Sequence, residues 1–188
     1  MLHLVQSSPR DSYARDRNKI INAACGLLGK EYRRPLDAIP DLLEFIKYRL
    51  VRRLMPAKRQ AHTNRLERTV TICSRLVGGD YALALARELG HIRLHLYQFE
   101  SLLPIHDVEA DLYARTFLVP RRELAQQPAF QDLLSARHDG AALSPFVTEL
   151  ADFFGVTPAC MMLELGEMGL LAADSLTAKV QALPGGEA

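Results

Sequence analysis

The residues with the clearest chemical potential lie in the run Ala-Leu-Ala-Arg-Glu-Leu-Gly-His at positions 84–91. Glu88 and His91 match the zinc motif H-E-x-x-H, but Arg87 stands in place of its first histidine. In the intact motif, the two histidines lie one helical turn apart and bind Zn²⁺, while the glutamate activates a water molecule. Arginine offers no lone pair and remains protonated, so Arg87 cannot act as a ligand and adds a fixed positive charge.

The motif must lie on a helix if its side chains are to share one face. A helix is predicted over residues 81–97, with Asp80 as its cap. A second helix is predicted to begin at a cap formed by Asp107 and to end before Pro120, because its apolar residues recur every three or four positions. These two helices are expected to carry the candidate site.

The remaining elements are mostly helical. The β-branched run 68–74 predicts a strand, with a partner strand within residues 50–62. Further helices are predicted at residues 8–30, 39–50, 121–127, 130–137, 145–154 and 158–168. We therefore expect a mostly helical α+β fold with a small β-sheet, formed by a single domain over residues 1–173 and followed by a flexible tail at 174–188.

The composition is that of a globular protein, with 188 residues of which 48% are hydrophobic and 24% are charged. No apolar run approaches the ~20 residues of a membrane helix, and the first residues lack the layout of a secretory signal. The cysteines, Cys25, Cys73 and Cys160, are odd in number and widely separated, which favours reduced thiols. These features predict a cytoplasmic protein with no membrane partner.

Basic residues are concentrated in segment 45–75, which holds nine basic residues against one acidic residue, a local charge of +8. Since the whole chain carries +1, the rest is close to −7. The segment is a candidate partner-binding surface, and the alternative is a solvated basic face balanced by acidic neighbours after folding. The candidate contact residues are Arg49, Arg52, Arg53 and Arg59.

Two blocks of this chain, Asp80 to His95 and Glu109 to Pro120, resemble the ImmA/IrrE family of cytoplasmic zinc metallopeptidases. Members carry a helix of the form H-E-L-G-H-x-x-x-H and then a helix of the form E-A-N-x-F-A-x-x-L-L-x-P, whose glutamate completes the zinc site. The resemblance implies a minimal zincin-like metallopeptidase domain. It also implies a partner, because family members cut or otherwise relieve helix-turn-helix repressors.

Carried onto this chain, the resemblance makes Glu88 the general base, His91 the second zinc ligand and Glu109 the third. Arg87 takes the first ligand position, and Asp111 stands where asparagine is usual. Two protein ligands are too few for a tight zinc site, so we expect no bound cofactor. The preferred hypothesis is a zinc-lacking pseudopeptidase that regulates by binding a partner such as a helix-turn-helix repressor, with Arg87 paired to Glu88 or Glu109 in the space of the metal.

Three alternatives stay open at this point. In the first, the chain is an active zinc metalloendopeptidase that cleaves such a repressor. In the second, Arg87 is an engineered change in such an enzyme. The sequence therefore leaves the enzymatic status of the chain undecided. A shifted site is also possible, in which His91 and His95 bind a metal together with Glu109 or His106. Because Ile92 follows His91, that site would lack the catalytic glutamate and would favour binding over hydrolysis.

Residues 144–168 have the outline of a helix-turn-helix. The second helix of this pair contains Glu164 and Glu167 and no basic residue. Carboxylates repel phosphate, and a reader of the major groove normally presents arginine, lysine, asparagine or glutamine. The pair is therefore predicted to pack in the core, and direct binding of nucleic acid is not expected.

Overall fold

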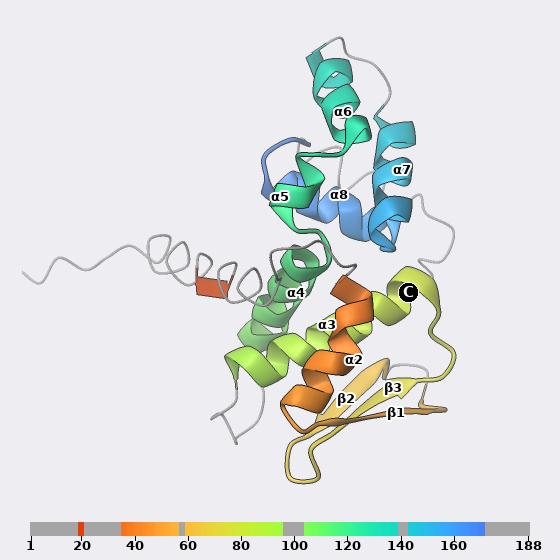
Figure 1. Cartoon of the computed structure of the whole chain (residues 1–188), viewed down its shortest axis with the longest axis vertical. Helices are drawn as coiled ribbons and strands as arrows, with labels where there is room; N and C mark the ends of the chain where they lie inside the picture. Colours follow the sequence, from red (N-terminus) through yellow and green to blue (C-terminus); the bar gives the residue numbers. More distant parts are fainter. Residues whose placement is uncertain (1–18, 21–34, 57–58, 96–103, 139–142, 172–188) are drawn as a thin grey trace, which may run out of the picture.

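The computed structural model describes residues 19–20, 35–56, 59–95, 104–138 and 143–171, and Figure 1 shows their arrangement. These residues form seven helices and one three-stranded sheet, which confirms the mostly helical α+β fold. The helices are α2 (Pro35–Phe45), α3 (Gly78–Leu94), α4 (Pro104–Leu118), α5 (Arg121–Leu124), α6 (Pro128–His138), α7 (Ser144–Phe154) and α8 (Pro158–Glu167). The strands are β1 (Arg49–Arg53), β2 (Ala61–Asn64) and β3 (Thr69–Cys73).

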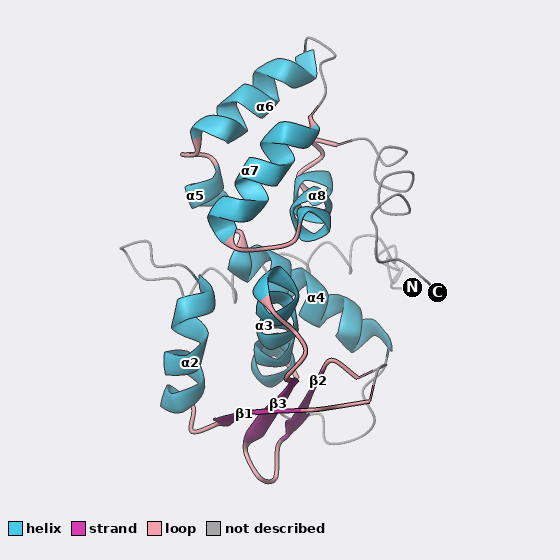
Figure 2. Cartoon of the chain, turned by 90° about the vertical axis from the view of Figure 1, so that its right-hand side faces the viewer, coloured by secondary structure: helices cyan, strands magenta, loops and turns pink. Residues whose placement is uncertain are grey.

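The sheet has the order β1-β3-β2, with β1 parallel and β2 antiparallel to the central strand β3. The strand predicted at 68–74 is confirmed as β3, and it has two partner strands where one was expected. Val70 and Ile72 are fully buried beneath α3, because alternate side chains of a strand point to the same face. The opposite, outer face of the sheet carries the other set of side chains, and Figure 2 shows no described helix covering it.

The helix predicted at 39–50 is wrong at both ends. Helix α2 begins at Pro35, a residue suited to a first helical turn, and contains Pro40 in its interior. It ends at Phe45, and after a turn in which Lys47 has a φ of 62°, Leu50 pairs with Val70 in the parallel ladder of β1 and β3. In this ladder the backbone N–H and C=O groups of β1 bond to β3, whereas in a longer helix they would bond within the helix.

Helix α3 crosses the inner face of the sheet and packs most extensively against α4 (Figure 2). Gly90 permits this close approach, since a Cβ atom there would lie 3.1 Å from Cδ1 of Tyr113 and 3.2 Å from Cα of Ala110. Apolar side chains of both helices, including Leu85, Leu89 and Phe117, belong to a buried cluster that extends from α2 to α8. The seam between α3 and α4 is thus the centre of the molecule.

Both helices of this seam begin earlier than predicted. The N-cap of α3 is Val77, and Asp80 lies within the first turn. Helix α4 begins at Pro104, so that Asp107 also lies in a first turn and does not cap the helix. Proline is favoured at the start of a helix, and an acidic residue in the first turn still interacts favourably with the helix dipole.

Helices α7 and α8 form the closing pair, joined at Gly155, whose φ of 68° ends α7 in the left-handed region. The Thr157 side chain caps α8 by accepting a hydrogen bond from the Cys160 backbone N–H. Phe154 and Leu165 are fully buried, which agrees with the prediction that this pair packs in the core. No described helix is by itself long and apolar enough to span a bilayer, and α7 and α8 reach that length only together, across a bend of 105°.

Several predictions fall on parts of the chain outside the described residues. They include most of the helix predicted at 8–30, Cys25 and the tail predicted at 174–188. The two described cysteines, Cys73 and Cys160, are buried free thiols, as the composition suggested.

Gly79 provides a test of how α3 is anchored to the closing helices. A Cβ atom at Gly79 would lie 2.4 Å from the Thr157 backbone N and 2.6 Å from the Val156 carbonyl carbon, so an alanine side chain cannot fit without moving backbone. We expect Gly79→Ala to lower the free energy of unfolding by about 3 kcal/mol, measured by urea denaturation.

Gly78→Ala is the matched control. Its φ of 54° is strained for alanine but its Cβ would meet open space, so we expect a loss of about 1 kcal/mol. Equal losses in the two variants would contradict the close approach.

Candidate functional site

Helix α3 presents two separate groups of polar side chains. Arg87, His91 and His95 follow one another at intervals of four residues and therefore form a stripe along one face, toward α4. Glu88 points instead toward the sheet, where the Thr63 hydroxyl of β2 donates a 2.5 Å hydrogen bond to its Oε2. Burial raises the pKa of the Glu88 carboxyl, and the bond from Thr63 opposes that shift.

Arg87 is paired with two carboxylates of α4. Its Nε lies 2.7 Å from Oδ1 of Asp111, and its Nη2 lies 3.4 Å from Oδ1 of Asp107. The prediction that Arg87 pairs with Glu88 or Glu109 was therefore wrong in its partners. The reason is that Asp107 and Asp111 are one turn apart on α4 and both face the Arg87 turn of α3. Burial raises the pKa of the Asp111 carboxyl, and the Arg87 charge opposes that shift.

The zinc ligands implied by the family resemblance do not converge. His91 lies with Nε2 3.3 Å from Oδ1 of Asp107, whereas Oε2 of Glu109 lies 2.8 Å from Nε2 of His95. The guanidinium of Arg87 lies where the motif would place the metal ion, and its positive charge neutralises the carboxylates of Asp107 and Asp111. The residues present therefore do not fit a zinc ion at the H-E-x-x-H position.

A row of polar contacts runs along the seam from α4 to α3 and back. It begins at Asp107, passes to Nε2 of His91, continues from Nδ1 of His91 to Nδ1 of His95 at 3.3 Å, and ends at Glu109. His91 and His95 are both buried. Burial and the neighbouring His95 lower the pKa of His91 to about 4, and burial also lowers the pKa of His95.

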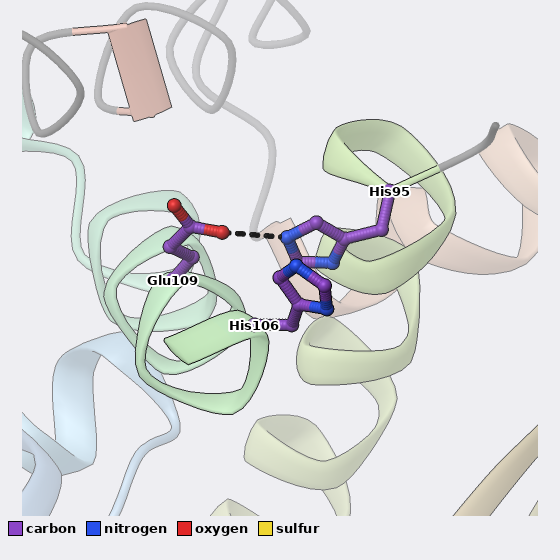
Figure 3. Close-up of side chains that lie close together, drawn as sticks. All are labelled: His95, His106 and Glu109. Carbon is purple, nitrogen blue, oxygen red and sulfur yellow. Dashed lines mark hydrogen bonds and ion pairs between the residues drawn. The ribbon is translucent and has the colours of Figure 1, made fainter. Parts of the chain in front are cut away.

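A group of three metal-ligating side chains forms one helical turn beyond the motif (Figure 3). His95 comes from the end of α3, and His106 and Glu109 come from the first turns of α4. One ligand atom from each residue lies within 4.8 Å of the others, and the two imidazole rings have centroids 4.4 Å apart. Among the described residues, this group has the chemistry to hold a metal ion, and it shares His95, His106 and Glu109 with the shifted site considered from the sequence.

His106 was considered from the sequence only as part of the shifted site. It entered only as a substitute for Glu109, whereas the structure places both in one group. A signal for this was available, because residues 106 and 109 are three apart and must share a face once they lie on one helix. Asp107 was treated only as a helix cap, although its carboxylate contacts both Arg87 and His91.

The four candidate arginines of the basic segment do not share one surface. Arg49 and Arg53 alternate with Arg52 along β1 and therefore lie on the outer face of the sheet. Arg52 lies on the inner side, donating hydrogen bonds to the backbone oxygens of Ser74 at 3.2 Å and Leu76 at 2.8 Å. Its guanidinium is also 4.8 Å from the ring centroid of Tyr81 on α3. Arg52 thus fixes the β3–α3 connection.

Arg59 lies just before β2 and belongs with the outer group. Partial burial lowers the pKa of the exposed His62 imidazole, and the positive charges of Arg59 and Arg53 lower it further. These two guanidiniums therefore lie close to His62, which follows Ala61 onto the outer face. We call Arg49, Arg53, Arg59 and His62 the outer basic face.

Comparison with known proteins adds one finding about the fold. No protein-family model matches this sequence, and a comparison with curated proteins finds no match. The structure is similar to that of a Mycobacterium tuberculosis transcriptional regulator, with a TM-score of 0.59 and 17% sequence identity. The similarity is one of fold. It covers 81% of this chain and 48% of the regulator, so this chain spans about half the length of that protein.

The lowered pKa of His91 predicts how the stability of the metal-free protein depends on pH. The imidazole titrates near 6.5 in an unfolded chain and at about 4 in the folded protein. Between these values the unfolded chain binds the proton more readily, so stability should fall as the pH falls from 6.5 to 4. The expected loss from His91 is on the order of 3 kcal/mol, and His95 acts in the same direction.

Urea denaturation at several pH values in the presence of EDTA would measure this loss. His91→Asn removes the titrating group, so its stability should vary distinctly less between pH 6.5 and 4 than that of the parent chain. The same pH slope in both proteins would show that His91 is not the group responsible.

Proposed function

We propose that this chain is a regulatory protein, similar to the ImmA/IrrE family, which has lost hydrolysis and acts by binding a partner such as a helix-turn-helix repressor. The observation that carries this proposal is the 2.7 Å pair between Arg87 and Asp111. A guanidinium cannot coordinate a metal and does not lose its proton, so the motif position holds no metal while this pair is formed. Glu88 is then left without a metal-bound water to activate.

The fold comparison supports a regulatory context. The similar solved structure is a transcriptional regulator about twice as long as the aligned part, so its own activity does not transfer directly. We infer that the outer basic face contacts an acidic surface of the partner, because Arg49, Arg53 and Arg59 are exposed there. Arg52 is excluded from that role by its contacts within the protein.

A second function, an active zinc metalloendopeptidase, is favoured by one observation. Burial raises the pKa of Glu88, as is common for a carboxylate that serves as a general base near neutral pH. For this function Arg87 would have to leave Asp107 and Asp111, and His91 and Glu109 would have to approach one ion. Glu88 is therefore the residue whose replacement separates the two functions.

The two functions differ in their response to Glu88→Gln. Glutamine keeps an oxygen that accepts the Thr63 hydrogen bond but cannot act as a base, so the fold should persist. We expect the variant to restore the transcript profile of a strain that lacks the gene as fully as the parent chain does. The measurement is RNA sequencing of the complemented strains at matched protein levels. Failure to restore the profile by a folded variant would indicate hydrolysis and contradict the proposal.

The partner surface is tested by reversing charge on the outer basic face. Arg49→Glu combined with Arg53→Glu should abolish complementation, because the variant repels an acidic partner. The matched control combines Arg93→Glu with Arg122→Glu, which reverses two exposed charges on α3 and α5, away from the sheet. We expect the control to complement normally. Full complementation by the first double variant would remove the outer basic face from the proposal.

A further inference from the structure

We infer that His95, His106 and Glu109 form a binding site for one divalent first-row metal ion such as Zn²⁺, which joins the end of α3 to the start of α4 and does not support hydrolysis. This site lies one turn beyond the H-E-x-x-H position and uses neither Arg87 nor Glu88. It is independent of the outer basic face and of any partner bound there.

The first argument is geometric. The two imidazoles are buried and the Glu109 side chain is 26% exposed, so the three groups converge where little water competes. Their ligand atoms lie within 4.8 Å of one another. Metal–ligand distances of about 2.1 Å place ligand atoms of a tetrahedral site roughly 3.4 Å apart, so small side-chain rotations would bring all three to one ion.

The second argument comes from the partners of His95. Its Nδ1 lies 3.3 Å from Nδ1 of His91, and its Nε2 lies 2.8 Å from Oε2 of Glu109. A proton on Nε2 would join only His95 and Glu109, whereas a metal ion there would also engage His106.

The same row orients the proposed ligand. Asp107 holds His91, and His91 in turn contacts Nδ1 of His95, which leaves Nε2 of His95 directed at Glu109. Metal-ligating histidines usually have their second ring nitrogen held in this way, because the outer contact fixes the tautomer and the ring orientation. His91 and Asp107 are therefore positioning residues for this site.

The donor set selects the class of ion. Two imidazoles and one carboxylate suit Zn²⁺ and its first-row neighbours, whereas Ca²⁺ and Mg²⁺ prefer oxygen ligands alone. The set does not provide a catalytic base. Glu88 lies seven residues before His95, about 10 Å along the helix axis, and its carboxylate is bonded to Thr63 of the sheet. The ion would thus bind and stabilise.

Isothermal titration of the full chain with ZnCl₂, after removal of metal with EDTA, tests the site. We expect one Zn²⁺ per chain and a rise in melting temperature on binding. His106→Gln and Glu109→Gln should each weaken binding by about 30-fold or more, since loss of an outer contact alone already costs about 10- to 100-fold. His62→Gln is the matched control, because it removes an exposed histidine of β2 and should leave affinity unchanged.

The outcomes separate this site from the motif position. A zinc ion at the motif would need His91 and Glu109 but not His106, so full affinity in His106→Gln would overturn the inference. Absence of binding by the parent chain, or equal weakening by His62→Gln, would also overturn it. If His106→Gln fails to fold by circular dichroism, an anomalous difference map at the zinc edge decides, and a peak coordinated by His91 would overturn the inference. None of these results depends on complementation by the Glu88 variant, so the inference and the proposed function can fail separately.

Discussion

The Arg87 guanidinium, held between Asp111 and Asp107, is the interaction on which the polar part of this structure depends. Two carboxylates one turn apart on the same helix face repel each other, and partial burial raises the pKa of Asp111, so a cation between them stabilises both charges. A zinc ion and an arginine both meet that need. The arginine does so with a charge that is covalently attached and cannot dissociate, and it blocks the position for any metal.

The rest of the seam follows from this pair. Asp107 is shared between Arg87 and His91, so His91 is drawn toward an aspartate and its other nitrogen meets His95. His95 is then the residue that reaches Glu109. The side chains that can bind a metal therefore lie one helical turn beyond the motif position, at the end of α3. The tight packing at Gly90 permits these contacts, because it brings the two helix backbones close together.

Periodicity and turn residues predicted the elements that carry the site. The β-branched run gave β3, and the spacing of apolar residues placed the motif on one helix and Glu109 on a second. The partners of Arg87 were not predictable in this way, because they depend on the rotation of α4 against α3, which packing decides. The basic segment 45–75 does not form one surface either. Side chains alternate along β1, so Arg52 lies on the inner face of the sheet and Arg49 and Arg53 lie on the outer face. Strand pairing of Leu50 likewise overrode its place in a helical pattern.

The central claim is that the pair formed by Arg87 closes the motif position and leaves metal binding to the turn beyond it. The most direct measurement is an anomalous difference map at the zinc absorption edge, from crystals of the full chain grown with ZnCl₂. The account predicts one peak between His95, His106 and Glu109, with Arg87 still paired to Asp111. A peak coordinated by His91 and Glu109, with Arg87 displaced from both aspartates, would contradict it.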